Sequence, residues 1–288
     1  MKTQIDLLKT YGLQIRGILG QHLLIDPNLQ RKTVNLLELS EGDWVLEIGP
    51  GLGALTGWML ECGARVAAVE KDPRFLKVLE EIYAREIEEG RLILVQGDIL
   101  ETDFKKLRTR HGITGKTKLA GNLPYYITAP ILFKVFEDRE LFSRAVFTMQ
   151  LEVAARIFAN PGSKDYGRLS VMVRLFTDVT HAFDISPGCF TPAPKVRSSV
   201  IVCDFHHRPL KGGHAREQEI SEFVKVAFSQ RRKKLISVLA RHDKFGLSKA
   251  DWQEIFKKRG FPESVRAEEL LLKDFLTLSG KLSAPAHD

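Results

Sequence analysis

Five short apolar runs, each of strand length, alternate with longer amphipathic segments through the first half of the chain. The runs cover residues 43–49, 65–70, 91–96, 118–122 and 144–150. Apolar positions between them follow the 3.6-residue spacing of helices. Asp26 followed by Pro27 is typical of a helix start ahead of the first run. Strands that alternate with helices predict βαβ units, and therefore a parallel sheet with right-handed crossovers.

Two further strand-like runs, residues 178–186 and 199–205, follow with no helical segment between them. The loop that joins them is rich in proline, so the two runs are able to pair antiparallel. Five parallel strands followed by such a pair match the seven-stranded mixed sheet of many methyltransferases. Beyond residues 206–214, which we interpret as a linker, the apolar spacing is helical and predicts a small all-helical domain.

Composition limits where the protein works. No run of about 18 apolar residues exists, so no membrane span is expected. The first residues lack the apolar core of a signal peptide. Three widely spaced cysteines, Cys62, Cys189 and Cys203, favour reduced thiols over a disulfide framework or a zinc site. Together these features predict a cytoplasmic protein.

The net charge of +7 lies mostly in the C-terminal part of the chain. Residues 1–206 hold 26 basic and 25 acidic side chains, a net charge of +1, whereas residues 207–288 hold 17 and 11, a net charge of +6. Ordinary solubility charge would explain the total. The asymmetry favours a nucleic-acid surface in the C-terminal domain.

A glycine-rich stretch, LEIGPGLGALT, connects the first apolar run to a helical segment. Gly49, Gly51 and Gly53 allow a tight turn and a close approach of a ligand to the backbone. Glu70, at the end of the second run, stands where an acid can bind ribose hydroxyls. The same spacing also satisfies the dinucleotide fingerprint, and a purely structural turn would look similar, so this motif alone does not identify the ligand.

Two more acids distinguish between these ligands. Glu47 precedes the glycines, and Asp98 follows the third run, where its carboxylate can accept a hydrogen bond from an adenine amino group. S-adenosylmethionine is a cation with an ammonium group, a ribose and an adenine. The pyrophosphate of a nicotinamide dinucleotide would be repelled by acids near its helix N-terminus. An acid at the end of each of the first three runs therefore favours S-adenosylmethionine.

The stretch AGNLPYYIT follows the fourth run, so Asn122 should reach the same crevice. Its amide oxygen can accept a hydrogen bond from an exocyclic amino group. Backbone carbonyls at Leu123 and Pro124 can accept the second hydrogen, and Tyr125 can stack on the base. This arrangement suits methylation of an adenine amino group on a base flipped out of its stack. A proline turn with buried tyrosines is the alternative.

With these residues placed, the chain resembles the ribosomal RNA adenine N6,N6-dimethyltransferases, in particular those that act on the small subunit. The resemblance extends from about Leu19 into the C-terminal domain. Its motifs are LGQHLLID, LEIGPGLGALT, VEKD, QGDIL, GNLPYYIT, YGRLSVMV, CFTPAPKVRSSV and AFSQRRKKL. Together these motifs are highly specific, whereas the glycine loop alone is not.

The resemblance implies a Rossmann-like class I methyltransferase domain over residues 26–206, an N-terminal segment 1–25 packed near the cofactor, and a helical RNA-binding domain over 207–288. It implies S-adenosylmethionine as methyl donor and two adjacent adenosines near the 3′ end of small-subunit (16S) rRNA, in the immature 30S particle, as targets. It implies no metal and no membrane.

The resemblance also assigns residues. Cofactor contacts fall on His22, Leu24, Gly49, Glu70, Asp98 and Asn122, to which our reading of the loop adds Glu47 and Gly51. Target-base contacts fall on Asn122, Leu123, Pro124, Tyr125 and Phe190, with Phe190 as a second aromatic wall opposite Tyr125. The charge asymmetry and the resemblance together favour RNA phosphate contacts for Arg231, Arg232, Lys233 and Lys234, at the start of a predicted helix, where a solvated helix face is the alternative. We assign Tyr126, where the family often has asparagine, to packing.

The N-terminal motif departs from the family pattern. The family usually reads Gly-Gln-Asn-Phe-Leu, and here the sequence is Gly20-Gln21-His22-Leu23-Leu24. An imidazole is not an amide, so a ring contact with the cofactor and a backbone contact alone both stay open. Near its ordinary pKa of about 6.5 such a ring contact would be pH-sensitive.

Three other functions compete. A large-subunit rRNA methylase of the macrolide-resistance type shares the cofactor and acceptor motifs, but YGRLSVMV and AFSQRRKKL resemble the small-subunit enzyme. A non-catalytic assembly or transcription factor on this fold predicts decay of these motifs, and only the position of His22 departs. An NAD-dependent dehydrogenase leaves GNLPYY without a role. For the methyltransferase we expect direct transfer of the methyl group to the amino nitrogen that Asn122 holds. This transfer needs neither a covalent enzyme intermediate nor a general base.

Overall fold

The computed structural model describes residues 3–15, 21–206 and 209–280. They form two compact units, each built from two stretches of chain. The first unit contains the residues up to 154 together with 177–205, and the second contains 155–176 together with the residues from 206 onward. Some residues of the predicted N-terminal segment and linker lie outside the described residues.

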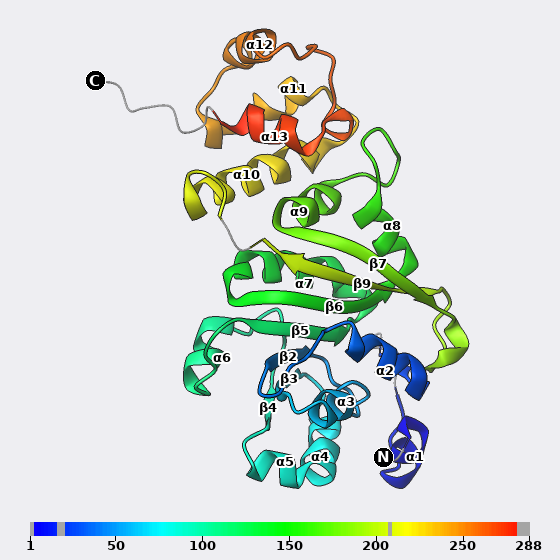
Figure 1. Cartoon of the computed structure of the whole chain (residues 1–288). Helices are drawn as coiled ribbons and strands as arrows, with labels where there is room; N and C mark the ends of the chain where they lie inside the picture. Colours follow the sequence, from blue (N-terminus) through cyan, green and yellow to red (C-terminus); the bar gives the residue numbers. More distant parts are fainter. Residues whose placement is uncertain (1–2, 16–20, 207–208, 281–288) are drawn as a thin grey trace. The chain divides into compact units, whose positions relative to one another are not determined.

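A mixed sheet of seven strands forms the first unit, in the order β4-β3-β2-β5-β6-β9-β7 (Figure 1). The neighbours from β4 to β6 are parallel, and β9 is antiparallel to both β6 and β7. The predicted fold class is therefore confirmed. The strands are β2 (Trp44–Ile48), β3 (Arg65–Glu70), β4 (Leu92–Gln96), β5 (Thr117–Asn122), β6 (Phe142–Gln150), β7 (Thr177–Ile185) and β9 (Ser198–Phe205).

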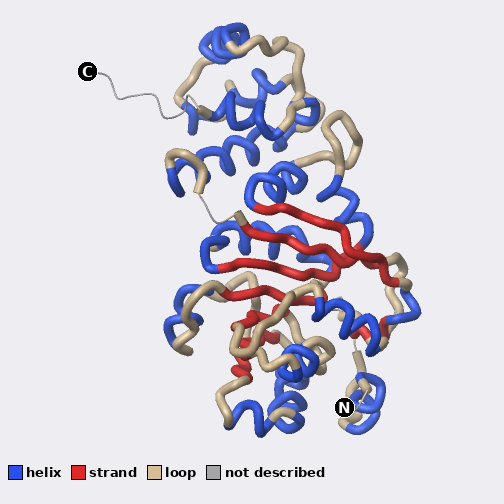
Figure 2. Tube along the Cα trace, in the orientation of Figure 1, coloured by secondary structure: helices blue, strands red, loops and turns tan. Residues whose placement is uncertain are grey.

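Helices alternate with these strands, as Figure 2 shows. At the start of α2 the Asp26 carboxylate accepts hydrogen bonds from the backbone of Asn28 and Leu29, as expected of an N-cap. The helical segment between β3 and β4 is divided into two helices, because Tyr83 leaves the helical conformation. The helices are α1 (Gln4–Thr10), α2 (Pro27–Asn35), α3 (Thr56–Glu61), α4 (Pro73–Ile82), α5 (Ala84–Glu88), α6 (Phe104–Arg110) and α7 (Thr128–Glu137).

The core of this unit lies between the sheet and the helices α2, α3 and α4. Val45 and Val66 of neighbouring strands belong to one buried cluster with Met59 of α3 and Leu79 of α4. Strands β2 and β3 are buried on both faces, which explains why their sequences are nearly continuous apolar runs rather than alternating ones.

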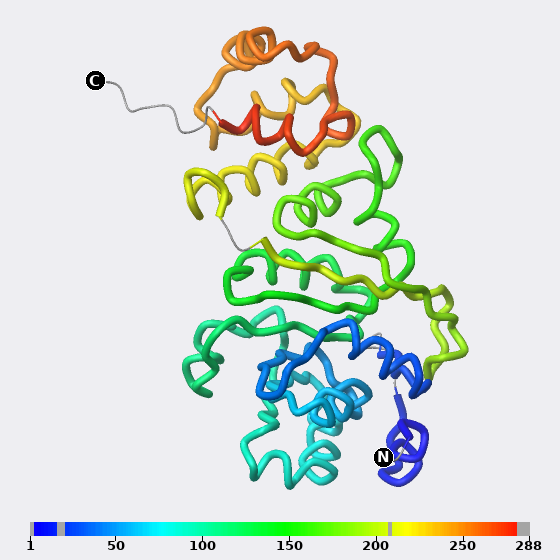
Figure 3. The backbone as a smooth tube through the Cα atoms, viewed as in Figure 1, coloured from blue at the N-terminus to red at the C-terminus, as the bar shows by residue number. Residues whose placement is uncertain are grey.

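A second, two-stranded sheet joins segments far apart in the sequence. Strand β1 (Leu23–Leu24) pairs antiparallel with β8 (Phe190–Thr191), and Leu24 lies opposite Phe190. The Ile25 backbone N–H extends this contact by donating to the Cys189 carbonyl at 2.8 Å. Figure 3 shows the blue N-terminal segment meeting the yellow-green segment that contains β8. This pairing fixes residues 21–24 beside the main sheet.

The second unit is helical. Its helices are α9 (Arg168–Phe176), α10 (Gly213–Ala227), α11 (Leu235–Leu239), α12 (Lys249–Lys258) and α13 (Leu272–Ser279), and α8 (Leu151–Phe158) enters it from the first unit. Phe223 of α10 packs its ring against Trp252 and Phe275. Ser248 caps α12, and its side chain accepts a hydrogen bond from the Asp251 backbone N–H. Among the described residues, no helix has the length and apolarity that crossing a membrane requires.

The domain prediction placed residues 155–176 with the methyltransferase sheet, and the structure groups them with the C-terminal helices instead. Helix α9 packs on α10 and α13, and the buried Tyr166 hydroxyl donates to the Leu270 carbonyl at 2.8 Å. The chain thus leaves the first unit, contributes to the second, and returns to form β7. No local pattern reveals such a return.

Gly121 of β5 lies close to the neighbouring strand β2. We predict that Gly121→Ala destabilises the protein. A Cβ atom there would lie 2.9 Å from the Ile48 carbonyl oxygen and 3.0 Å from Leu123. Overpacking of this kind costs about 1–3 kcal/mol, which should lower the midpoint of urea unfolding. Gly188→Ala is the control, because nothing lies within 4 Å of its added Cβ. Equal midpoints for the two variants would contradict the prediction.

Candidate active site

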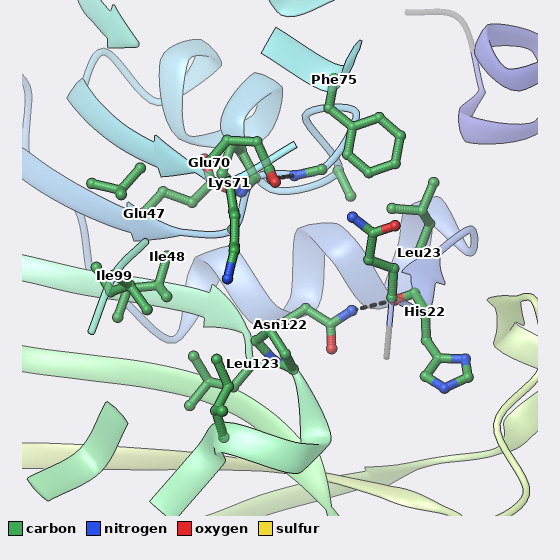
Figure 4. Close-up of a pocket in the computed structure, with 18 of the residues that line it drawn as sticks. His22, Leu23, Glu47, Ile48, Glu70, Lys71, Phe75, Ile99, Asn122 and Leu123 are labelled. Carbon is green, nitrogen blue, oxygen red and sulfur yellow. Dashed lines mark hydrogen bonds between the residues drawn. The ribbon is translucent and has the colours of Figure 1, made fainter. Parts of the chain in front are cut away.

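A pocket opens where the parallel strands β2, β3, β4 and β5 end (Figure 4). Ligands of doubly wound sheets bind at this edge. Residues 21–24 of the N-terminal segment complete its lining. Every predicted cofactor residue lines the pocket: His22, Leu24, Glu47, Gly49, Gly51, Glu70, Asp98 and Asn122.

The glycine loop is held by the acid at the end of β3. The Glu70 carboxylate accepts hydrogen bonds from the backbone N–H of Gly51 at 3.0 Å and of Asp72 at 2.8 Å. Gly51 has a φ of 58°, and a Cβ there would lie 2.7 Å from Leu23, so only glycine fits. Burial raises the pKa of the Glu70 carboxyl, against the lowering by these backbone donors. Each of its oxygens accepts one of these bonds, and a carboxylate oxygen has a further lone pair that can accept a ligand hydroxyl.

Asp98 forms an ion pair inside the pocket. Its carboxylate accepts from the Lys71 ammonium at 2.8 Å and from the Leu100 backbone at 2.9 Å. The hydrogen bond from Lys71 holds the pKa of Asp98 below its usual range. Asp98 is therefore an ionised acceptor at neutral pH, as its predicted role requires.

Glu47 was expected to be a charged acid that faces the ligand, but its carboxyl is buried and holds a proton. The side chain is only 1% exposed and accepts a hydrogen bond from the Thr56 hydroxyl at 2.5 Å. Burial raises the pKa of this carboxyl to about 8, with the nearby Glu70 adding to the effect. In the free protein Glu47 is therefore mostly protonated at neutral pH. The sequence could not reveal this, because desolvation depends on packing around the strand end.

The Asn122 amide is fixed by the N-terminal segment. Its NH₂ group donates to the His22 carbonyl at 2.6 Å, drawn as a dashed line in Figure 4. Its oxygen, Oδ1, is buried and has no hydrogen-bond partner in the part of the chain that the structure describes. Buried acceptors without a partner are rare in folded proteins, and their desolvation costs about 1–3 kcal/mol. Asn122 thus presents one oriented, unused acceptor to the pocket.

The backbone after Asn122 supplies a second acceptor. The Pro124 carbonyl already accepts from the Ile127 backbone at 3.2 Å and the Thr128 hydroxyl at 3.1 Å, within the turn that begins α7. The Leu123 carbonyl accepts no hydrogen bond from the described residues. Of the two carbonyls considered from the sequence, that of Leu123 is the available one.

The ring that stacks on Tyr125 comes from His22 and not from Phe190. The His22 and Tyr125 ring centroids are 5.2 Å apart with an angle of 28° between the planes. His22 Nδ1 lies 2.6 Å from the Pro192 carbonyl oxygen, so Nδ1 carries the proton of this hydrogen bond. Phe190 is 3% exposed in the core beside Leu24 and does not line the pocket. The β1–β8 pairing directs it there.

Sequence reasoning missed three pocket residues with polar side chains. Gln21 has a buried Oε1 atom without a hydrogen-bond partner among the described residues, Lys71 forms the ion pair with Asp98, and Tyr126 lines the pocket with 58% of its surface exposed. The assignment of Tyr126 to packing is therefore wrong. The sequence could have indicated Gln21 and Lys71, because each directly neighbours a predicted cofactor contact, His22 and Glu70 respectively.

The basic run lies in the second unit, in the turn between a 3₁₀ segment, Phe228–Gln230, and α11, rather than on a helix. Arg231 serves structure: its guanidinium donates to the Glu268 carboxylate and to the carbonyls of Ser163 and Lys164. Arg232, Lys233 and Lys234 are exposed, and no ion pair involves them within the described part of the chain.

The mixed seven-stranded sheet, with a glycine loop and acids at its strand ends, defines a Rossmann-like methyltransferase. The model of the family described as ribosomal RNA adenine dimethylase matches residues 12–279. The chain belongs to this family.

Relatives match over nearly the whole chain. The ribosomal RNA small subunit methyltransferase A of Halothermothrix orenii is 37% identical over 278 residues, which are 96% of this chain and 91% of the relative. That of Geobacter metallireducens is 38% identical over 95% of this chain and 97% of the relative.

Two solved structures share the fold. A dimethyladenosine transferase from Plasmodium falciparum matches with a TM-score of 0.70 and 27% identity, over 89% of this chain and 96% of its own. The 23S rRNA methyltransferase ErmE matches with a TM-score of 0.64 over 90% of this chain and 99% of its own, at 23% identity.

Replacing Glu47 by glutamine should remove a pH dependence of stability. Glu47 keeps its proton in the folded protein up to about pH 8, whereas its ordinary pKa is 4.5. Between these values the folded state binds more protons than the unfolded state, so wild-type stability falls as pH rises. Glu47→Gln has no such proton to lose. Its stability relative to wild type should increase from about pH 5 to about pH 8, by up to several kcal/mol.

Urea unfolding of wild type and Glu47→Gln across this range measures the difference. Glu61→Gln, which removes an exposed carboxyl from α3, controls for the change in net charge. Parallel stability profiles for wild type and Glu47→Gln would show that the buried carboxyl does not hold its proton.

Proposed function

We propose that this protein transfers methyl groups from S-adenosylmethionine to the N6 amino groups of two adjacent adenosines near the 3′ end of small-subunit (16S) rRNA, dimethylating each. The substrate we propose is the immature 30S particle during ribosome biogenesis. Membership of the rRNA adenine dimethylase family supports the reaction, and the relatives named small subunit methyltransferase A support the choice of subunit. The observation that carries the chemistry is the oriented, unpaired oxygen of Asn122.

The pocket residues fit the cofactor. The buried Gln21 Oε1, which has no partner among the described residues, offers an acceptor for a donor such as the ammonium group. None of the described atoms stands within 4 Å of the Cβ position of Gly49. Glu70 would accept from the ribose hydroxyls and Asp98 from the adenine amino group. His22 and Leu24 would contact the cofactor through the N-terminal segment, and Gly49 and Gly51 through the loop. When bound, S-adenosylmethionine supplies an electrophilic methyl group.

The acceptor site would orient the target nitrogen. The lone pair of an adenine amino group is conjugated with its ring, so the nitrogen is a poor nucleophile until it is held in line with the methyl carbon. Asn122 Oδ1 and the Leu123 carbonyl would accept its two hydrogens, and Tyr125 would support the flipped ring. The methylated amine becomes acidic enough to lose its proton to water. After the first transfer one hydrogen remains, so one acceptor suffices for the second.

The exposed cations of the second unit would contact RNA phosphates. Arg232, Lys233 and Lys234 are exposed and without ion pairs among the described residues, as phosphate-binding side chains should be. We exclude Arg231 from this surface because its guanidinium is occupied by Glu268 and two carbonyls. The nucleic-acid surface inferred from the charge asymmetry would thus consist of three cations here rather than four.

Asn122→Ala should lower kcat for methyl transfer to immature small subunits by about 100-fold or more, because the target nitrogen loses its orienting acceptor. Asn35→Ala removes an exposed amide outside this pocket and is the control. Turnover close to wild type in the Asn122 variant would contradict the role of the amide. The assay should include purified large subunits, and methylation of those alone would contradict the proposed substrate.

Arg232→Gln with Lys233→Gln should reduce the slope of log affinity against log salt by about 1.5, since each phosphate contact contributes about 0.7–0.9. Binding of small-subunit RNA across a salt series measures this slope. Arg85→Gln with Lys106→Gln removes two exposed cations from the first unit as a charge-matched control. A similar loss of slope in both double variants would point to net charge rather than to a contact.

A further inference from the structure

Tyr126 is an exposed aromatic side chain beside the acceptor motif. Four large apolar side chains are classed as exposed among the described residues: Ile5, Tyr126, Val196 and Leu271. Tyr126 is the most exposed of them, at 58%, and it is the one that lines the pocket. Its hydroxyl makes no hydrogen bond and its ring no ring contact with the described part of the chain. Packing therefore does not explain this tyrosine.

Local geometry directs Tyr126 away from Tyr125. Residues Tyr125–Ile127 form a 3₁₀ turn after Pro124, and three residues per turn separate neighbouring side chains by about 120°. The Tyr125 side chain is fixed in place by its hydrogen bond with the Ser198 hydroxyl and by stacking with the His22 ring. Tyr126 therefore extends from the rim of the pocket when Tyr125 lies within it.

A second segment with exposed side chains is hydrogen-bonded to the acceptor motif. The segment from Pro192 to Ser198 is fixed to the site at both ends, by the His22–Pro192 and Tyr125–Ser198 hydrogen bonds. Between these anchors Lys195 and Val196 are exposed, and Lys195 forms no ion pair with the described residues. An exposed ring, together with an aliphatic side chain and a cation on a segment that is hydrogen-bonded to the neighbouring Tyr125, offers the kinds of group that single-stranded nucleic acid binds.

We propose that Tyr126 is the stacking platform for the base next to the target adenosine. This inference rests on the proposed function, in which the two target adenosines are adjacent. When one of them is flipped into the pocket, its neighbour loses a stacking partner and stands at the rim. The ring of Tyr126 replaces that partner. Tyr126 thereby positions the strand, while Asn122 and Tyr125 hold the reacting base.

Variants at this position separate stacking from other roles. Tyr126→Leu keeps an apolar side chain but has no aromatic face, and it should raise KM for unmethylated small subunits by about five- to a hundred-fold, the effect of losing one base–aromatic stack. Tyr126→Phe keeps the ring and should restore the wild-type KM. Ile5→Ala, which removes an exposed apolar side chain from α1, should leave KM unchanged. The affinity for S-adenosylmethionine, measured by calorimetry, should be the same in all of them.

Fluorescence of the neighbouring base itself distinguishes base stacking on Tyr126 from contact of Tyr126 with a protein. The neighbouring adenosine of small-subunit RNA is replaced by 2-aminopurine, because stacking on an aromatic ring quenches the fluorescence of this base. The substituted RNA is then assembled with its proteins and mixed with each variant. Wild type and Tyr126→Phe should quench this fluorescence, and Tyr126→Leu should not. Equal fluorescence in all three, or an unchanged KM in Tyr126→Leu, would overturn the platform. Absence of methyl transfer by the wild type would instead contradict the proposed function itself.

Discussion

The parallel order of β4, β3, β2 and β5 is the constraint on which the site depends. Because right-handed crossovers bring successive strands to one sheet in the same direction, their carboxyl ends lie on one edge. Groups separated by dozens of residues, such as Glu70, Asp98 and Asn122, therefore line one pocket. These side chains reach the pocket because each lies at or just after the end of a strand, so no long loop is needed to bring them there.

The N-terminal segment converts this edge into a site with defined acceptors. The pairing of β1 with β8 places the His22 carbonyl where it accepts a hydrogen bond from the NH₂ group of Asn122. This bond orients the amide, whose buried oxygen has no partner among the described residues. The side chain of His22 stacks on Tyr125. One residue thus contacts both the amide and the ring of the acceptor motif, the amide through its backbone carbonyl and the ring through its side chain.

Features governed by local sequence could be predicted. The main strands follow from buried apolar runs, and the helix starts follow from caps such as Asp26 and Ser248. Features governed by distant partners could not. Phe190 is directed into the core by a two-residue strand far along the chain, and Arg231 is engaged by a loop in residues 155–176. The exposure of Tyr126 was missed because two adjacent tyrosines look alike in sequence, and only the 3₁₀ turn distinguishes them.

The composition of the second unit from residues 155–176 and from the residues after 206 has a consequence for biosynthesis. The chain emerges from the ribosome in order, so residues 155–176 are made long before α10 and α13, on which α9 packs. Strands β7 and β9 follow α9, and the sheet is complete before the second unit has its partners. For this interval the side chains of α9 that pack on α10 and α13 lack these partners. The second unit is thus exposed to misassembly until the last helices of the chain are synthesised.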